Sequence, residues 1–270
     1  MKKEYLTLKE VQLEALEILK NVTKFIEKNN LTYYLYAGTL LGAIRHKGFI
    51  PWDDDVDIFM PREDYNKFIK IFNNKEIGEQ YELKALELNN TKNPYAKVIN
   101  KNIMVEGEQK EDKNLWIDIF PIDGCSSDEQ EYLKQAKKIN FYGILRYIND
   151  TKLKYIITQN RSVANRIIKV ILKPFVMLLP IKYYSKKINK MATKFSYNDS
   201  EYVGVVVWGY GERLKKEEVF SDTIKVKFEN EEFNAPVGYD AYLKQSYGDY
   251  MIIPDDKNRE AHHVLAMRKL

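Results

Sequence analysis

Four aspartates occupy five positions of the chain: Asp53, Asp54, Asp55 and Asp57. Like charges this close raise one another's pKa, so a chain carries such a cluster at low cost only on a solvated loop or around a cation. The residues from 56 to 60 predict a strand, which would place the carboxylates of Asp55 and Asp57 on one face, about 6–7 Å apart along the backbone. This arrangement predicts a site for a hard cation, Mg2+ or Mn2+, which Asp53 joins if the strand extends back.

The aspartate cluster has two other interpretations. A solvated acidic turn is disfavoured because the apolar residues Val56 and Ile58 alternate with the acidic ones. A calcium loop of the EF-hand type matches at its first three ligand positions but fails afterwards. Ile58 stands where that loop requires glycine, Asp64 stands where it requires glutamate, and Pro61 lies inside it.

A third carboxylate for the same cation is expected from Asp118, between two isoleucines of a predicted strand at 115–120. A charge in such a strand is costly unless it is paired or bound to a metal. The alternative is a salt bridge from Asp118 to a lysine. Asp123, just before Gly124, is expected to be a turn residue.

Hydrophobic periodicity outlines the elements that must position these carboxylates. Helices are predicted at 8–26, from Pro61 onward, at 127–147 and at 238–247, strands at 33–37, 56–60, 81–88, 95–99 and 115–120, and a hairpin at 225–234. Gly38 and Thr39 are expected to form a turn. Strands and helices mixed without regular βαβ spacing predict an α+β fold, a mixed β-sheet core flanked by helices, with a helical insertion.

The net charge of +4 is unevenly distributed, because residues 151–198 hold 11 basic residues and no acidic one. The apolar, lysine-bearing stretch within 161–195 predicts either peripheral contact with a membrane surface or a buried helical hairpin whose lysines extend to solvent. Helix breaks are expected at Pro174 and Pro180. The charges are not interleaved as in a nucleic-acid groove, so no nucleic-acid partner is expected.

The single cysteine, Cys125, excludes an internal disulfide and CxxC metal sites. Charged residues interrupt the start of the chain where a signal peptide would be apolar, and no run reaches the roughly 18 apolar residues of a spanning helix. We therefore expect a cytoplasmic protein that contacts the inner face of the cell membrane at most peripherally.

Three stretches together resemble the LicD family of phosphocholine transferases. The first runs from Tyr36 to Ile58, YAGTLLGAIRHKGFIPWDDDVDI, and is followed after Phe59 by MPREDY at 60–65. The second is WIDIFPIDG at 116–124, and the third spans 247–263. The resemblance covers about residues 20–125 and 225–263. It implies the polymerase-β-like nucleotidyltransferase fold, with Asp55, Asp57 and Asp118 as the metal-binding and catalytic carboxylates.

The implied activity is metal-dependent transfer of phosphocholine from CDP-choline to a sugar hydroxyl of a lipid-linked or cell-surface glycan precursor, of the teichoic-acid or lipopolysaccharide type. Related proteins with the same core move ribitol phosphate or mannosyl phosphate, which stay open as alternatives. A true nucleotidyltransferase, which leaves the nucleotide on the product, is a second alternative. An inactive membrane-surface scaffold is disfavoured because all three carboxylates are present.

In the implied mechanism, Asp118 accepts the proton of the acceptor hydroxyl. Gly38 and Thr39 allow the backbone to approach the donor phosphates, because glycine has no Cβ. Arg45 is expected to contact a donor phosphate, with a salt bridge to the aspartates as its alternative. Lys97 is a second phosphate candidate that could equally be a surface lysine.

Choline carries a quaternary ammonium group, which binds to aromatic faces rather than through hydrogen bonds. Trp52, beside the aspartates, is the first candidate, although most aromatic side chains of a protein belong to its core. Tyr33, Tyr34, Tyr36, Trp116 and Trp208 are the further candidates. His263 is expected to contact the donor.

The chain is expected to divide into three parts. Residues 1–125 form the catalytic core, residues 126–222 a basic helical insertion, and residues 223–270 a segment that returns to the core.

Overall fold

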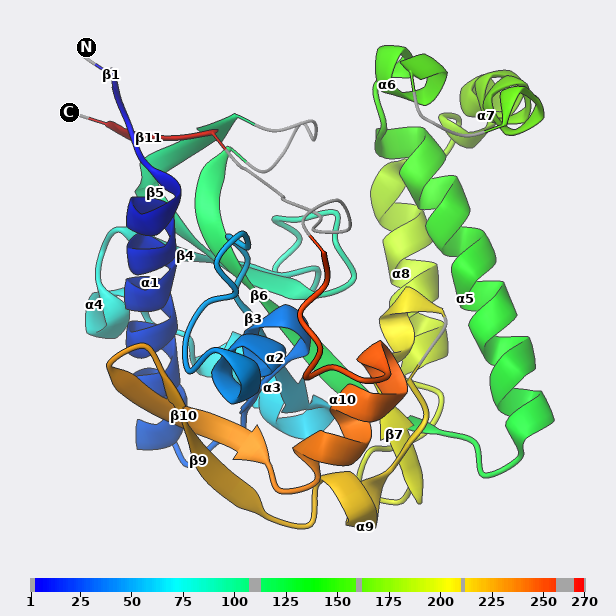
Figure 1. Ribbon diagram of the computed structural model, residues 1–270. Coiled ribbons are helices and arrows are strands. Elements are labelled where there is room, and N and C mark those ends of the chain that lie inside the picture. The colour runs from blue at the N-terminus through cyan, green and yellow to red at the C-terminus, as the bar shows by residue number, and fades with distance from the viewer. Residues whose placement is uncertain (1–2, 107–112, 159–161, 210–211, 256–264, 270) are drawn as a thin grey trace.

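The computed structural model describes residues 3–106, 113–158, 162–209, 212–255 and 265–269 (Figure 1). In these ranges the chain forms a mixed sheet flanked by helices, so the predicted α+β class is confirmed. The strands of this sheet are β1 (Lys3–Tyr5), β2 (Tyr34–Leu35), β3 (Asp57–Pro61), β4 (Tyr81–Lys84), β5 (Ala96–Glu106), β6 (Asn114–Cys125), β7 (Tyr202–Gly204), β8 (Leu214–Lys215) and β11 (Leu265–Lys269).

The strand order through the sheet is β1, β11, β5, β6, β3, β2, with β4 paired to β5 and with β7 and β8 continuing from the end of β6. β3 and β6 run parallel, and the other described pairings of this sheet are antiparallel. Side chains alternate between the faces of a strand, so paired residues of neighbouring strands share a face. This register brings together side chains that lie far apart in the sequence.

The helices of the N-terminal half are α1 (Leu8–Lys28), α2 (Ala37–Arg45), α3 (Arg62–Ile71) and α4 (Asn74–Ile77). Thr7 and Glu10 form the capping box that starts α1, which packs against β5 and β6. The turn expected at Gly38 and Thr39 is wrong, since both residues lie in the first turn of α2.

The helical segment contains α5 (Glu129–Asp150), α6 (Leu153–Thr158), α7 (Val163–Val176), α8 (Ile181–Ala192) and the 3-10 helix η1 (Val206–Trp208). α5 and α8 pack side by side, while α6 and α7 lie together at one end of this pair (Figure 1). The break expected at Pro174 lies slightly later: the proline falls inside α7, which ends two residues beyond it at Val176. The break at Pro180, which precedes α8, is confirmed.

The C-terminal part begins with α9 (Lys216–Val219) and the predicted hairpin, β9 (Thr223–Phe228) and β10 (Glu231–Pro236), and continues through α10 (Tyr239–Tyr247). β11 then pairs with β5 and β1, so the two described ends of the chain lie together at one edge of the sheet (Figure 1). One hydrophobic cluster joins residues from α1 to β11, and a small second cluster of Ile148, Val176 and Tyr184 joins α5, α7 and α8. The division at residues 125 and 222 stays a prediction.

Among the described residues, none of the helices combines the length and the apolar character that a bilayer crossing requires.

Candidate active site

Three charged side chains form a row across the middle of the sheet. Asp57 on β3 pairs with Asp118 on β6, and Asp118 pairs with Lys97 on β5. Adjacent strands are about 4.8 Å apart, so the register alone holds the three residues side by side on one face. The parallel pairing of β3 with β6 therefore brings together the two aspartates that the sequence singled out.

Lys97 is buried, with 5% of its side chain exposed, so its alternative interpretation as a surface lysine is wrong. Its Nζ lies 3.4 Å from Asp118 Oδ1 and 4.1 Å from the centre of the Trp116 ring. Trp116 Nε1 donates a hydrogen bond of 3.1 Å to Asp118 Oδ2. The salt bridge considered for Asp118 is thus present, and an aromatic ring supports both partners.

Like charges surround Asp57. Burial raises the pKa of its carboxyl well above the usual range, and the negative charges of Asp118, Asp55 and Asp53, in that order, raise it further. Lys97 is a smaller influence in the opposite direction. Holding these negative charges close together costs free energy, and a bound divalent cation would offset that cost by its positive charge.

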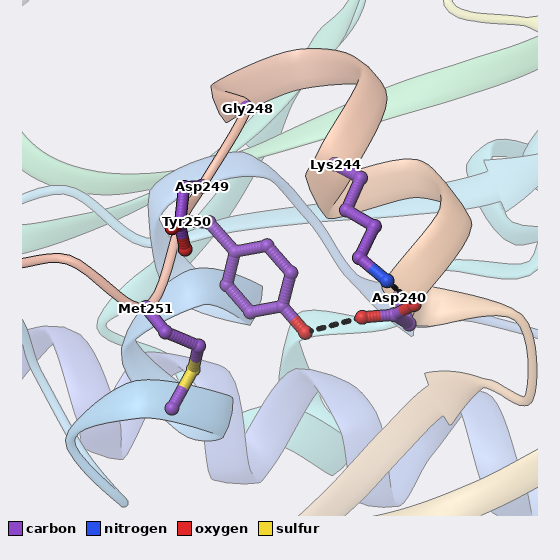
Figure 2. Close-up of a pocket in the computed structure, with 6 residues that line it drawn as sticks. All are labelled: Asp240, Lys244, Gly248, Asp249, Tyr250 and Met251. Carbon is purple, nitrogen blue, oxygen red and sulfur yellow. Dashed lines mark hydrogen bonds and ion pairs between the residues drawn. The ribbon is translucent and has the colours of Figure 1, made fainter.

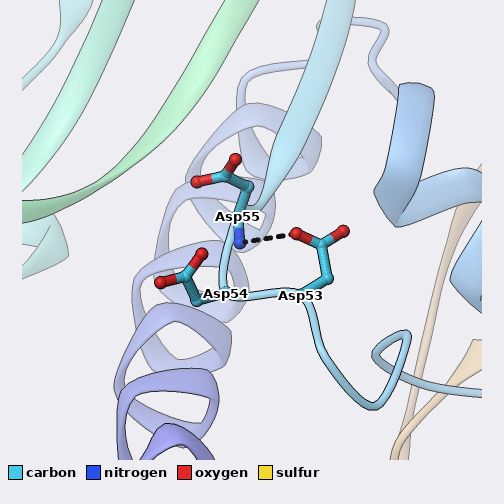
Figure 3. A group of neighbouring side chains, drawn as sticks. All are labelled: Asp53, Asp54 and Asp55. Atoms are coloured by element: carbon cyan, nitrogen blue, oxygen red, sulfur yellow. Dashed lines mark hydrogen bonds between the residues drawn. The ribbon is translucent and has the colours of Figure 1, made fainter. Parts of the chain in front are cut away.

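The loop before β3 adds carboxylates to this region (Figure 3). Asp53, Asp54 and Asp55 each offer an oxygen, and these oxygens lie within 4.8 Å of one another. Asp53 Oδ1 also accepts a hydrogen bond of 3.4 Å from the backbone N–H of Asp55 (Figure 3). A set of carboxylate oxygens suits a hard divalent cation, so the residues present could hold one. Asp54, which is buried, was not predicted as a ligand.

The first turn of α2 is fastened to the start of β3. Thr39 Oγ1 accepts a hydrogen bond of 2.8 Å from the backbone N–H of Asp57, and the N–H of Tyr36 donates one of 3.0 Å to the carbonyl of Asp57. A Cβ at Gly38 would lie 2.9 Å from Asp53 Oδ2, so glycine permits this close approach. Ala37 before it has a φ of 46°, a strained conformation for a residue with a Cβ. Contact of Gly38 and Thr39 with phosphate stays a prediction.

Arg45 lies at the end of α2 and holds the segment that follows α10. Its Nη1 donates to the carbonyls of Tyr250, at 2.8 Å, and Ile252, at 3.3 Å, and its Nε donates to His46 Nε2 at 2.9 Å. The half-buried Trp52 ring and the His46 ring form a T-shaped pair, with 6.2 Å between centroids. The contacts described for Arg45 are thus with the segment after α10 and with the neighbouring His46. The role of Arg45 in binding phosphate and that of Trp52 in binding choline stay predictions.

An open pocket of about 610 Å³ lies beside the segment that Arg45 holds, and it is lined by Asp240, Lys244 and residues 248–251 (Figure 2). Asp240 organises it, accepting hydrogen bonds of 2.8 Å from the Tyr250 hydroxyl and 2.7 Å from Lys244 Nζ. Tyr247 immediately precedes the pocket residues 248–251 in the sequence. Burial raises the pKa of its hydroxyl, and the negative charges of Asp57 and Asp53 raise it further. The end of α10 therefore lies within electrostatic reach of the aspartates.

An aromatic row adjoins the charged row on the sheet. Phe59 and Phe120 follow Asp57 and Asp118 by two residues on the same strands, hence on the same face, and the Tyr36 ring packs on both at 4.8 and 5.3 Å. Tyr242 from α10 packs on Tyr36 at 5.9 Å. Tyr95 and Trp208 pack on Phe120, at 4.5 and 5.6 Å between ring centroids.

Glu212 lies beside this aromatic block and was missed by the sequence analysis. Its Oε1 accepts hydrogen bonds from the hydroxyls of Tyr36, at 2.6 Å, and Tyr242, at 3.5 Å, and its Oε2 accepts one from the N–H of Val205 at 3.3 Å. Burial raises the pKa of Glu212 to about 6, although these donors oppose the rise. No local pattern around residue 212 indicates these contacts, because Tyr36 and Tyr242 are distant in the sequence.

The structure thus brings together Asp57, Asp118 and Lys97, with Asp53, Asp55, Gly38 and Thr39 around them. Tyr33 and Tyr34 are core residues: Tyr33 donates to Glu27, and Tyr34 packs on Phe59 and Phe220. His263 lies outside the described residues. The metal-binding and catalytic roles assigned to the aspartates stay predictions.

Comparison with known proteins places this site in a family. Residues 30–152 match the family described as LicD/FKTN/FKRP, nucleotidyltransferase domain. The lipopolysaccharide cholinephosphotransferase LicD of Haemophilus influenzae is 32% identical over 267 residues, 96% of this chain and 97% of that protein. The ribitol 5-phosphate transferase FKRP of Mus musculus is 30% identical over 110 residues, 39% of this chain and 19% of that protein. The chain therefore belongs to the LicD family.

Proposed function

We propose that this protein transfers phosphocholine from CDP-choline to a sugar hydroxyl of a cell-surface glycan precursor, with Mg2+ or Mn2+ as its cofactor. The observation that carries the proposal is the register that aligns Asp57 with Asp118 in a chain similar over nearly its full length to a lipopolysaccharide cholinephosphotransferase. In the reaction the acceptor oxygen forms a bond to the phosphorus of phosphocholine, and the bond from that phosphorus to CMP breaks.

Asp57, Asp118, Asp55 and Asp53 would hold the cation. When bound, it supplies positive charge that stabilises the donor diphosphate and the leaving CMP. The Asp118 carboxylate accepts the proton of the acceptor hydroxyl as the new bond forms. Lys97, which pairs with Asp118 in the structure, is close enough to turn its ammonium toward a donor phosphate.

The choline group would sit at the aromatic row. Two residues along a strand span about 7 Å, so a phosphate at Asp57 and Asp118 directs the remainder of phosphocholine toward Phe59 and Phe120. Glu212, which accepts a hydrogen bond from Tyr36, supplies a negative charge there, and the half-buried Trp208, which packs on Phe120, would offer a ring face to a quaternary ammonium. This assignment moves the choline site from Trp52 toward the aromatic block.

The acceptor is proposed to be a lipid-linked or cell-surface glycan precursor of the teichoic-acid or lipopolysaccharide type. The protein would meet it in the cytoplasm, at the inner face of the cell membrane. The similarity to a ribitol 5-phosphate transferase favours ribitol phosphate as the second candidate for the transferred group.

The test is product analysis after incubation with CDP-choline, Mg2+ and an acceptor that contains N-acetylhexosamine, with CDP-ribitol in a parallel reaction. The proposal expects release of CMP and choline phosphate on the sugar. Release of free phosphocholine with CMP left on the sugar would instead indicate nucleotidyl transfer. Faster turnover of CDP-ribitol would favour the second candidate.

A further inference from the structure

Helix α7 presents its apolar side to solvent. Along one stripe of this helix, Ile167, Ile168, Ile171 and Phe175 are all exposed, with 59% of Ile171 and 66% of Phe175 accessible. Leu178, just beyond the helix, is 79% exposed. In a helix that packs on a globular core this stripe faces inward, so the polarity of α7 is inverted.

Hydrogen bonds from the basic side of α7 hold this orientation. Lys173 Nζ donates to the carbonyls of Ile148 and Thr151, each at 2.8 Å, and of Asn149, at 3.2 Å, at the end of α5. Arg166 Nη1 donates to the carbonyl of Ile157 at 2.9 Å. Carbonyls at a helix end lack intrahelical partners, so these contacts satisfy groups that would otherwise need water. Rotating the apolar stripe inward would break them.

The segment that carries the stripe exposes further apolar residues and contains no acidic residue. α6, which lies beside α7 at the same end of the helical segment, exposes half of its Ile157 (Figure 1). Residues 151–198 supply 11 positive charges and no negative one. This surface therefore combines an apolar face with a positive electrostatic field.

We propose that the exposed stripe of α7 docks in the headgroup region of an anionic lipid bilayer, with the helix lying parallel to the membrane. An amphipathic helix binds such an interface by burying its apolar face, and basic residues strengthen the attraction to anionic lipid. A second copy of the chain is a poorer occupant, because it would place one acid-free basic segment against another. The surface is separate from the active site and does not depend on the proposed reaction.

The experiment is flotation of the full-length chain with two kinds of vesicle, phosphatidylcholine mixed with phosphatidylglycerol and phosphatidylcholine alone. The test variant is I167S/I171S/F175S. The matched control, L13S/I71S/L88S, removes the same kind of exposed side chain from other elements. Because all six side chains are exposed, both variants should fold, and transfer to a water-soluble acceptor should be equal in both.

Wild type and control are expected to float with the mixed vesicles, the test variant at least about tenfold less, and wild type only weakly with phosphatidylcholine alone. Equal flotation of the test variant and the control would overturn the proposal. So would failure of the wild type to bind, or wild-type dimers that the test variant abolishes without any vesicle binding by wild type.

Discussion

Strand β6 carries two aspartates in opposite situations. Asp123 is fully buried and accepts two hydrogen bonds of 2.7 Å from the Arg62 guanidinium, a closed bidentate pair. Asp118 pairs with the more distant ammonium of Lys97 and accepts a hydrogen bond from Trp116, and Asp57 lies beside it. Asp123 is thus neutralised by its own arginine, whereas the ion pair of Asp118 with Lys97 lies in a region where the charges of Asp118, Asp55 and Asp53 act on Asp57. The difference separates a pair that stabilises the fold from a cluster suited to bind a ligand.

The largest expected effect is the loss of turnover when Asp57 or Asp118 is replaced. Asp57→Asn or Asp118→Asn should lower the rate of CMP release by about 10³-fold, because each removes charge where the reaction needs it. Urea unfolding of Asp57→Asn should show no loss of stability, since a like-charge repulsion disappears. Asp199→Asn, in an exposed turn, is the control and should change neither quantity. Normal turnover in Asp57→Asn would contradict the assignment.

Replacement of Asp123 should have the reverse effect, a loss of stability with little change in turnover. Asp123→Asn leaves the Arg62 guanidinium buried without its partner, which should cost about 3 kcal/mol of unfolding free energy. The rate per folded molecule should stay close to wild type. Urea unfolding and active-site-normalised CMP release check both statements. Lost turnover in a stable Asp123→Asn protein would remove the contrast between the two ends of β6.

Glu212 extends the comparison to a carboxylate held by hydroxyls rather than by a cation. Glu212→Gln should raise the KM for CDP-choline about tenfold and leave that for CDP-ribitol unchanged, because only choline is a cation. In wild type this KM should fall as pH rises through about 6, where Glu212 ionises. A pH-independent KM in wild type would count against the choline site.

The same group makes a signed prediction for stability. The pKa of Glu212 is raised in the folded state from 4.5 to about 6. Its contribution to stability is therefore fully present below pH 4.5 and is lost as pH rises through about 6. Unfolding curves of wild type and Glu212→Gln across this range should diverge with rising pH, the variant becoming relatively more stable. Parallel curves would contradict the raised pKa.

The smallest effect concerns the close approach at Gly38. In Gly38→Ala the new Cβ would displace the Asp53 carboxylate, which should lower turnover about tenfold. Stability should change by no more than about 1 kcal/mol, because a single flexible side chain can move aside. Gly143→Ala, where a Cβ meets no neighbour, is the matched control and should keep full activity. Equal turnover in the two variants would remove Asp53 from the site.

The parts that could be predicted from the sequence depend on local patterns. Strand alternation placed Asp57 and Asp118 on buried strands, and the family resemblance supplied their pairing. Long-range contacts could not be predicted: Asp123 was expected in a turn because Gly124 follows it, and its partner Arg62 is distant in the sequence. Glu212 has no local signal. The residues expected to turn at Gly38 proved to belong to the first turn of α2, and the positive φ lies one residue earlier, at Ala37. The outward orientation of α7 likewise depends on carbonyls of α5, which periodicity does not reveal.

The most direct test is a crystal of the protein soaked with Mn2+ and CDP-choline and measured for anomalous scattering. We predict a manganese peak bound by carboxylate oxygens of both Asp57 and Asp118, next to the donor diphosphate. A peak confined to residues 53–55, or a diphosphate bound away from Asp118, would contradict the account.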